Sequence, residues 1–154
     1  MKLLFPNRKK KKKWLSNVSN NTDIQGYYQC NIKNTKPNLL ILTKSMKECM
    51  FFYERGIYAM AINGENHQFN PLFIEHLKRH CKNIISFYDN DDSGIKGALD
   101  LKEKYNIDFF HIPKNICPAV NIKDITDMYK FFSKEEAEKI VNKLKENHIR
   151  SFDL

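Results

Sequence analysis

The 154-residue sequence has the length of one domain with a hydrophobic core. It contains no apolar stretch near the ~20 residues of a membrane-spanning helix, which excludes a membrane protein of that type. The net charge of +8 is concentrated in residues 1–36, which hold nine Lys and Arg but one acid, whereas the remainder is neutral.

The excess positive charge lies in a basic run formed by Arg8, Lys9, Lys10, Lys11, Lys12 and Lys13. Such a run attracts phosphate polymers through counterion release, although a solvated tail has the same composition. Periodicity is weak up to the turn signal at Lys36 and Pro37, so we interpret residues 1–37 as a basic, partly irregular N-terminal arm or linker that contacts nucleic acid.

Cysteine usage and the N-terminus indicate the compartment. The four cysteines form no Cys-x-x-Cys pair and have no histidine at zinc-ligand spacing; Cys49 and Cys81 have the context of buried thiols. Pro6 interrupts the N-terminus too early for a signal peptide. We expect a cytoplasmic protein with no structural zinc and no membrane partner.

Short apolar runs alternate with segments of helical periodicity along the rest of the chain. The predicted strands are 39–42, 57–62, 84–88 and 108–113. The predicted helices are 45–55, 71–80, 94–105, 123–129 and 133–146. This alternation is typical of an α/β fold with a parallel sheet. We expect a compact domain over residues 38–132, with about four strands flanked by helices, followed by a C-terminal helix and tail over 133–154.

The helix after the first strand has a clear start signal. Ser45 followed by Glu48 forms a capping box, in which the serine accepts a hydrogen bond from the backbone of the first turn. The spacing of Met46, Cys49, Met50 and Tyr53 predicts that these four side chains form the inner face.

Carboxylates follow the third predicted strand. Asp89 and Asp91 are two residues apart, so both can face the same side of an extended chain, where oxygen ligands suit Mg²⁺. An acidic turn is the alternative for this stretch alone. Glu65 leaves the second strand, and Asp124 and Asp127 come from a later loop. Acids that converge at the carboxyl edge of a parallel sheet repel one another, and a divalent metal relieves that repulsion.

The residues Tyr-Asp-Asn-Asp-Asp-Ser-Gly at 88–94 and Lys-Asp-Ile-Thr-Asp at 123–127 resemble the Toprim domain of bacterial-type and phage DNA primases. The segment 39–64 is similar to the first motif region of that domain, and the resemblance covers roughly 37–132. It implies a catalytic Mg²⁺ (or Mn²⁺) held by Asp89 and Asp91.

The sequence departs from the family pattern at one position of the first motif. Lys44 stands where the family has a metal-binding or general-base glutamate, and Ser45 stands where it has glycine, whereas Glu48 matches the later acidic position. One hypothesis is a variant active site in which Glu65 replaces the missing carboxylate. The other is a Toprim relative that binds nucleic acid or nucleotide without turnover.

The resemblance implies the catalytic part of a DNA primase, a Mg²⁺-dependent nucleotidyltransferase that makes RNA primers in DNA replication. Asp124 and Asp127 would then be supporting metal ligands, and Lys44 and Lys123 would contact phosphate. The implied partners are a single-stranded DNA template, NTPs and a separate primase zinc-binding or N-terminal chain, or a helicase. A phage or virus source would place the protein inside a host cell. A non-catalytic accessory replication factor and a Toprim nuclease or topoisomerase-like module are the alternatives.

Overall fold

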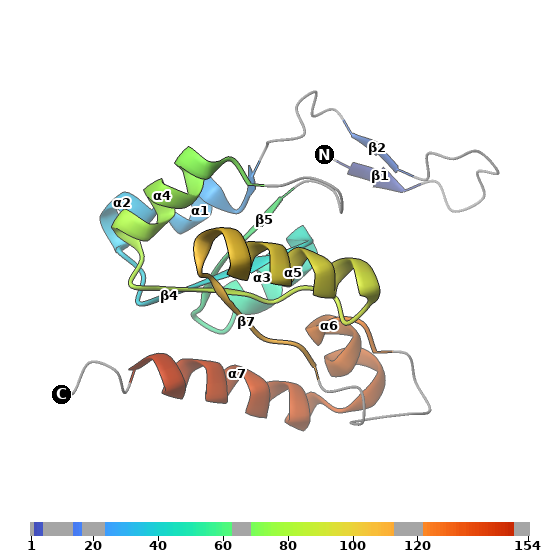
Figure 1. Ribbon diagram of the computed structural model, residues 1–154. Coiled ribbons are helices and arrows are strands. Elements are labelled where there is room, and N and C mark those ends of the chain that lie inside the picture. The colour runs from blue at the N-terminus through green and yellow to red at the C-terminus, as the bar shows by residue number, and fades with distance from the viewer. Residues whose placement is uncertain (1, 5–13, 17–23, 63–68, 113–121, 150–154) are drawn as a thin grey trace.

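The computed structural model describes residues 2–4, 14–16, 24–62, 69–112 and 122–149. Helices cover both faces of a central sheet (Figure 1). A separate antiparallel pair, β1 (Lys2–Leu4) and β2 (Trp14–Ser16), belongs to the N-terminal arm. No helix in the described part of the chain has the length and apolar character needed to cross a membrane.

The central sheet has five strands in the order β3-β5-β4-β6-β7. These strands are β3 (Ile24–Gln25), β4 (Leu39–Thr43), β5 (Tyr58–Ile62), β6 (Asn83–Ser86) and β7 (Asp108–Phe109). The strands β5, β4, β6 and β7 are parallel, as the alternating pattern predicts, and β3 pairs antiparallel with β5. The prediction of a parallel α/β sheet flanked by helices is therefore confirmed, with an additional antiparallel edge strand.

The described residues form seven α-helices and one π-helix; five of the α-helices lie close to the predicted residues, whereas the two short helices over 27–35 were not predicted. They are α1 (Tyr27–Cys30), α2 (Ile32–Thr35), α3 (Met46–Tyr53), α4 (Pro71–His80), α5 (Asp92–Tyr105), α6 (Ile125–Asp127), the π-helix η1 (Met128–Phe132) and α7 (Lys134–Ile149). Asn70 caps α4, and its side chain accepts a hydrogen bond from the Leu72 backbone N–H at 2.9 Å. Ser133 caps α7 by accepting from the Glu136 N–H at 3.2 Å.

The sheet separates two hydrophobic layers. Successive residues of β4 face opposite sides, so Leu39 and Ile41 pack with α3, α6, η1 and α7, while Leu40 and Leu42 pack with α1, α2, α4 and α5. All four side chains are buried, as expected for a central parallel strand covered on both faces.

The segment 24–36, placed in the N-terminal arm from its sequence, packs on the sheet. It supplies β3, α1 and α2, and its residues Cys30 and Ile32 are buried in the second layer. The thiols of Cys49 and Cys81 are buried as predicted, and burial raises the pKa of each to about 12.

The predicted inner face of α3 is wrong. Of the four predicted residues, Met46, Met50 and Tyr53 are exposed and Cys49 is buried as predicted, whereas Phe51 and Phe52 complete the buried face. The ring of Phe52 lies 5.6 Å from that of Phe87 beyond β6, centroid to centroid. Two overlapping apolar stripes run along this helix, and its packing angle on the sheet selects the one that carries the larger aromatic side chains.

The first turn of α5 requires glycine at position 94. The Asp91 carboxylate caps α5 by accepting a hydrogen bond from the Gly94 N–H at 2.8 Å. A Cβ at this position would lie 2.0 Å from the Asp89 carbonyl oxygen, so any side chain must displace the backbone.

We expect Gly94→Ala to lower the free energy of unfolding by at least about 3 kcal/mol, because the overlap is with backbone that cannot rotate away. Gly56→Ala is the matched control, since Gly56 has a φ of +74° but no atom within 4 Å of its added Cβ. Gly56→Ala should lower the free energy of unfolding by only about 1–2 kcal/mol, the cost of holding alanine in the left-handed backbone region. Urea unfolding measures the stability of both variants. Equal losses would contradict the overlap between a Cβ at position 94 and the Asp89 carbonyl.

Candidate metal centre

Three carboxylates meet at the edge of the sheet where the parallel strands end. Glu48 comes from α3, Asp89 follows β6, and Asp124 precedes α6. One oxygen of each lies within 4.8 Å of one oxygen of each of the other two. Glu48 and Asp124 are buried, and Asp89 is half-buried. We call these three residues the acidic cluster.

The loop after β6 is tied to the loop that carries Asp124. The Asn90 backbone N–H donates to the Lys123 carbonyl at 2.7 Å, and the Asn90 side-chain amide donates to the Ile112 carbonyl at 2.8 Å. These two bonds bring together three segments that are far apart in the sequence. They hold Asp89, which precedes Asn90, beside Asp124, which follows Lys123.

Helix capping orients the other two carboxylates. Asp124 accepts hydrogen bonds from the Asp127 N–H at 2.8 Å and from the Thr126 hydroxyl at 2.5 Å. The Ser45 hydroxyl accepts from the Glu48 N–H at 3.3 Å and lies 3.0 Å from the Glu48 carboxylate, to which it donates. The predicted cap at Ser45 is therefore confirmed, and the same residue positions the Glu48 side chain.

The acidic cluster stores unfavourable electrostatic energy at Glu48. Burial raises the pKa of this carboxyl to about 7; the charges of Asp124 and Asp89 add to the increase, and the hydroxyls of Thr43 and Ser45 oppose it. Within the described residues, Glu48 Oε1 and Thr43 Oγ1 are both buried without a hydrogen bond of ordinary geometry. A carboxylate oxygen of this kind is a ready ligand for a cation.

Lys47 places a positive charge next to Asp124 of the acidic cluster. Its Nζ lies 2.9 Å from Asp124 Oδ2 and 3.8 Å from Asp127 Oδ1. Burial acts to raise the pKa of Asp124, but the Thr126 hydroxyl and the Lys47 ammonium together lower it below its usual value. Asp124 is thus a permanent anion at neutral pH, unlike its neighbour Glu48.

Only some of the site residues predicted from the sequence lie in the acidic cluster. Asp89 and Asp124 lie in the acidic cluster, whereas Asp91 caps α5 and Asp127 approaches Lys47. Lys44 Nζ lies 4.5 Å from the centre of the Tyr88 ring, and Lys123 is exposed. Glu65 and the basic run Arg8 to Lys13 lie outside the described residues.

Two residues of this site, Glu48 and Lys47, were not among the predicted site residues. The sequence did indicate Glu48, because this residue matches the later acidic position of the first Toprim motif. Its role in the capping box, however, already accounted for a glutamate at this position. The Lys47 side chain is 56% exposed, and no spacing in the sequence relates it to Asp124.

Comparisons with known proteins give a consistent result. Residues 41–129, more than half of the chain, match the family model described as Toprim-like. No curated protein matches the sequence.

Solved structures of similar fold include primases. The catalytic domain of DnaG primase bound to ssDNA has 21% identity and a TM-score of 0.62, covering 87% of this chain and 45% of that one. The E. coli primase catalytic core has 21% identity and a TM-score of 0.62, covering 88% and 45%. The Aquifex aeolicus primase, with zinc-binding and RNA polymerase domains, has 19% identity and a TM-score of 0.61, covering 92% and 36%. The likeness is one of fold, and the chain spans less than half the length of these structures.

We expect Glu48→Gln to stabilise the protein in the presence of a chelator, by about 1–3 kcal/mol at pH 8. At pH 8 the Glu48 carboxylate is charged in both folded and unfolded states, so the full cost of burying it is present. The gain should decrease as the pH falls through about 7 and vanish near pH 4, where the carboxyl is protonated in both states.

Thermal and urea unfolding across this pH range test the expectation. Glu103→Gln, an exposed carboxylate of α5 outside the acidic cluster, is the control and should change stability little. A Glu48→Gln protein no more stable than the parent at pH 8 would contradict the electrostatic cost assigned to Glu48.

Proposed function

The chain belongs to the Toprim-like family, and from this premise we propose that it is the metal-binding catalytic part of a DNA primase. Its activity would be Mg²⁺-dependent nucleotidyl transfer in RNA primer synthesis. The convergence of Glu48, Asp89 and Asp124 at one sheet edge carries the proposal. The likeness of the fold to primase catalytic cores supports it.

The acidic cluster fits Mg²⁺ or Mn²⁺. It offers three carboxylate oxygens within 4.8 Å of one another, and Glu48 Oε1 has no hydrogen bond of ordinary geometry among the described residues. Hard cations of this size take oxygen ligands and often keep several waters. We assign Glu48, Asp89 and Asp124 as the ligands; a bound cation would supply neutralisation of phosphate charge and activation of a hydroxyl nucleophile.

Neighbouring acids would support this ligand set. Asp91 holds the turn after Asp89 through its hydrogen bond to the Gly94 N–H. Asp127 completes the first turn of α6 and shares Lys47 with Asp124. The proposal therefore retains Asp91 and Asp127 in the site as residues that fix the loops. A direct ligand role for either would require its second oxygen to reach the cation.

Two lysines would bind phosphate at the same edge. Lys44 ends the first strand of the motif, and its ammonium lies over the Tyr88 ring, where the cation–π contact fixes its position. Lys123 is exposed immediately before Asp124. Both would contact the triphosphate of an incoming nucleotide, because an ammonium cannot bind a metal ion but attracts phosphate oxygens.

The proposed partners follow from the same comparison. They are a single-stranded DNA template, NTPs and a separate primase chain with the zinc-binding or N-terminal regions, or a helicase. One similar structure, that of the Aquifex aeolicus primase, includes a zinc-binding domain in addition to its RNA polymerase domain. We propose that the protein works in the cytoplasm, including that of a phage-infected cell, and that Arg8 to Lys13 contact nucleic acid.

Primer synthesis on a single-stranded template with Mg²⁺ and NTPs tests the proposal, with and without the partner chain. Asp89→Asn should reduce product by more than the about 10- to 100-fold typical of residues that merely support a metal ligand. It should also abolish Mn²⁺ binding in calorimetry. Glu103→Gln should retain both, and full activity of Asp89→Asn would overturn the assigned role of the acidic cluster.

A non-catalytic nucleotide- or nucleic-acid-binding Toprim relative is the second candidate. It is favoured by the Lys47 ammonium, which lies 2.9 Å from Asp124 and already supplies a cation beside the cluster. In this alternative, Lys44 and Lys47 balance the acids without any metal.

Removal of the Lys47 charge separates the two candidates. We expect Lys47→Met to bind Mn²⁺ several-fold more tightly than the parent, because a positive charge next to the ligand Asp124 repels the metal ion. Lys130→Met, an exposed lysine of η1, is the control. If the parent bound no Mn²⁺ and Lys47→Met did, the non-catalytic candidate would be favoured; equal affinities would contradict the repulsion.

A further inference from the structure

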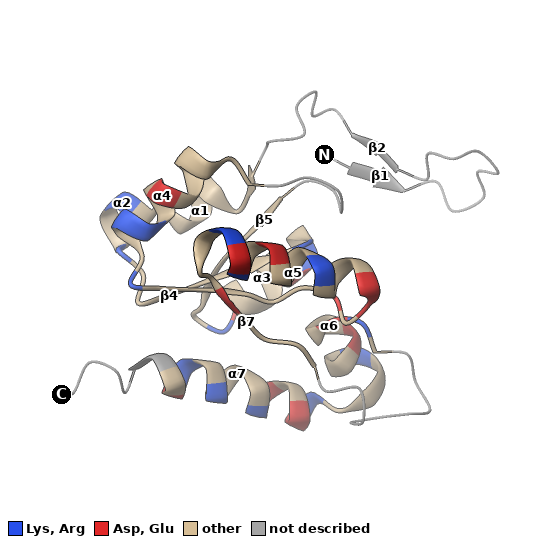
Figure 2. Ribbon diagram, viewed as in Figure 1, with Lys and Arg blue, Asp and Glu red and all other residues tan. Residues whose placement is uncertain are grey.

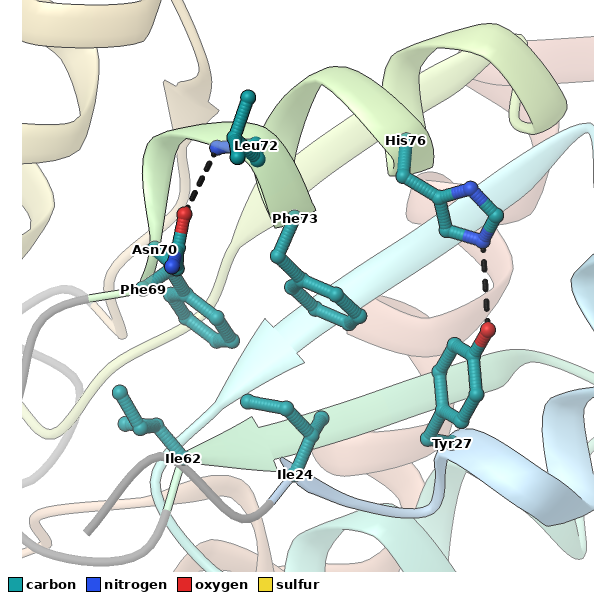
Figure 3. A pocket seen from close by; sticks show the side chains of 8 residues that line it. All are labelled: Ile24, Tyr27, Ile62, Phe69, Asn70, Leu72, Phe73 and His76. Carbon is teal, nitrogen blue, oxygen red and sulfur yellow. Dashed lines mark hydrogen bonds between the residues drawn. The ribbon is translucent and has the colours of Figure 1, made fainter.

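A pocket of about 440 Å³ lies against the opposite face of the sheet from α3 and α6. It is lined by Ile24, Tyr27, Ile62, Phe69, Asn70, Leu72, Phe73 and His76. Figure 3 shows the rings of Phe69 and Phe73 projecting from the start of α4 toward Ile62 and Ile24. The volume is in the range of pockets that bind small organic groups.

The pocket combines aromatic walls with a few polar groups. The rings of Phe69 and Phe73 are nearly parallel, and the Tyr27 ring lies 5.6 Å from that of Phe73. At one end the Tyr27 hydroxyl and His76 Nε2 are 3.2 Å apart, and at the other lies the amide of Asn70 (Figure 3). Flat aromatic walls with hydrogen-bonding groups at the ends suit a planar heteroaromatic ring such as a nucleobase.

Positive charge surrounds the pocket on the α2 and α4 side. Segments 27–36 and 70–82 together carry five Lys and Arg and one acid (Figure 2). Arg79 lies one turn after His76 on α4, and α2, which carries Lys33, packs on α4. Burial lowers the pKa of His76, and the positive charges of His80, Lys33 and Arg79 lower it further. Lys33 and Arg79 are exposed, and Arg79 has a weak contact with Glu75 at 4.0 Å.

We propose that this surface, formed by the pocket together with Lys33 and Arg79, binds single-stranded nucleic acid. One unstacked base would enter the pocket, and the neighbouring phosphates would lie on the two cations. A duplex does not offer an unstacked base. The two cations lie on different helices, so each can contact a different phosphate of the same strand. The inference rests on the proposed function, in which the chain acts on a single-stranded template.

The place of the pocket relates it to the acidic cluster. Its lining includes Ile62, the last residue of β5, and Phe73 from the first turn of α4. The acidic cluster lies at the same carboxyl edge, after the neighbouring strand β4 and after β6. Lys33 and Arg79 lie near the starts of β4 and β6, so a strand that leaves the pocket on the side away from these two cations would point toward the edge at which nucleotidyl transfer is proposed.

Salt dependence of binding tests the role of the two cations. With the full chain and a fluorescent oligothymidylate, Lys33→Gln combined with Arg79→Gln should reduce the slope of log affinity against log salt by about 1.4, at about 0.7 per phosphate on single strands. The control removes two exposed lysines from the other face, Lys130→Gln with Lys143→Gln. Equal slope changes in both double variants would overturn the inference.

Photo-cross-linking of an oligonucleotide with 5-iodouracil tests the pocket directly in the unmodified chain. Cross-links to the half-buried Tyr27, Phe73 or His76, not displaced by free nucleotides, are expected. Phe73→Leu should weaken binding by about 5-fold or more through loss of stacking. A far-UV circular dichroism spectrum like that of the parent and a cooperative urea unfolding transition will show that this variant is folded.

The outcomes separate the inference from the function on which it rests. Cross-links confined to other residues, or displaced by free nucleotides, would overturn the pocket assignment and leave the proposed primase function intact. Absence of any oligonucleotide binding would overturn the inference as well. The proposed function has its own tests, in metal binding and primer synthesis by the acidic cluster.

Discussion

The mutual repulsion of three carboxylates within 4.8 Å is the constraint on which the site depends. Direct pairing of β4 with β6 places the start of α3 next to the loop after β6. The two hydrogen bonds of Asn90 then attach the loop that carries Asp124. Burial raises the pKa of Glu48 to about 7, with the charges of Asp124 and Asp89 adding to the increase, and perturbed pKa values of this kind are typical of functional sites.

Lysines change the balance of charge in this site relative to the family pattern. Lys44 replaces a carboxylate by an ammonium and rests on the Tyr88 ring, while Lys47 pairs with Asp124. This edge thus combines three carboxylates with the ammonium groups of Lys44 and Lys47. On the other face, aromatic rings and basic residues line the pocket and its surroundings on α1, α2 and α4.

Elements with strong local signals were predictable from the sequence. The helix Pro71–His80 was predicted with the observed bounds because Asn70 and Pro71 mark its start, and Ser45 and Ser133 cap helices as expected. Elements defined by distant partners were not. The two-residue strand β3 has no periodicity of its own and exists through its pairing with β5. The buried stripe of α3 was mispredicted because packing on Phe87 selects it.

The sequence by itself determined the parallel α/β architecture, the Toprim-like motif and the position of Asp89 at a strand end, because each depends on residues close together in the chain. Tertiary structure decided that Glu48 from α3 joins Asp89 and Asp124, and that Asp91 turns away to cap α5. Which side chains of a motif meet depends on the packing angle of α3 and on the bonds of Asn90 to distant loops. Neither the packing angle nor these hydrogen bonds can be read from the spacing of residues along the sequence.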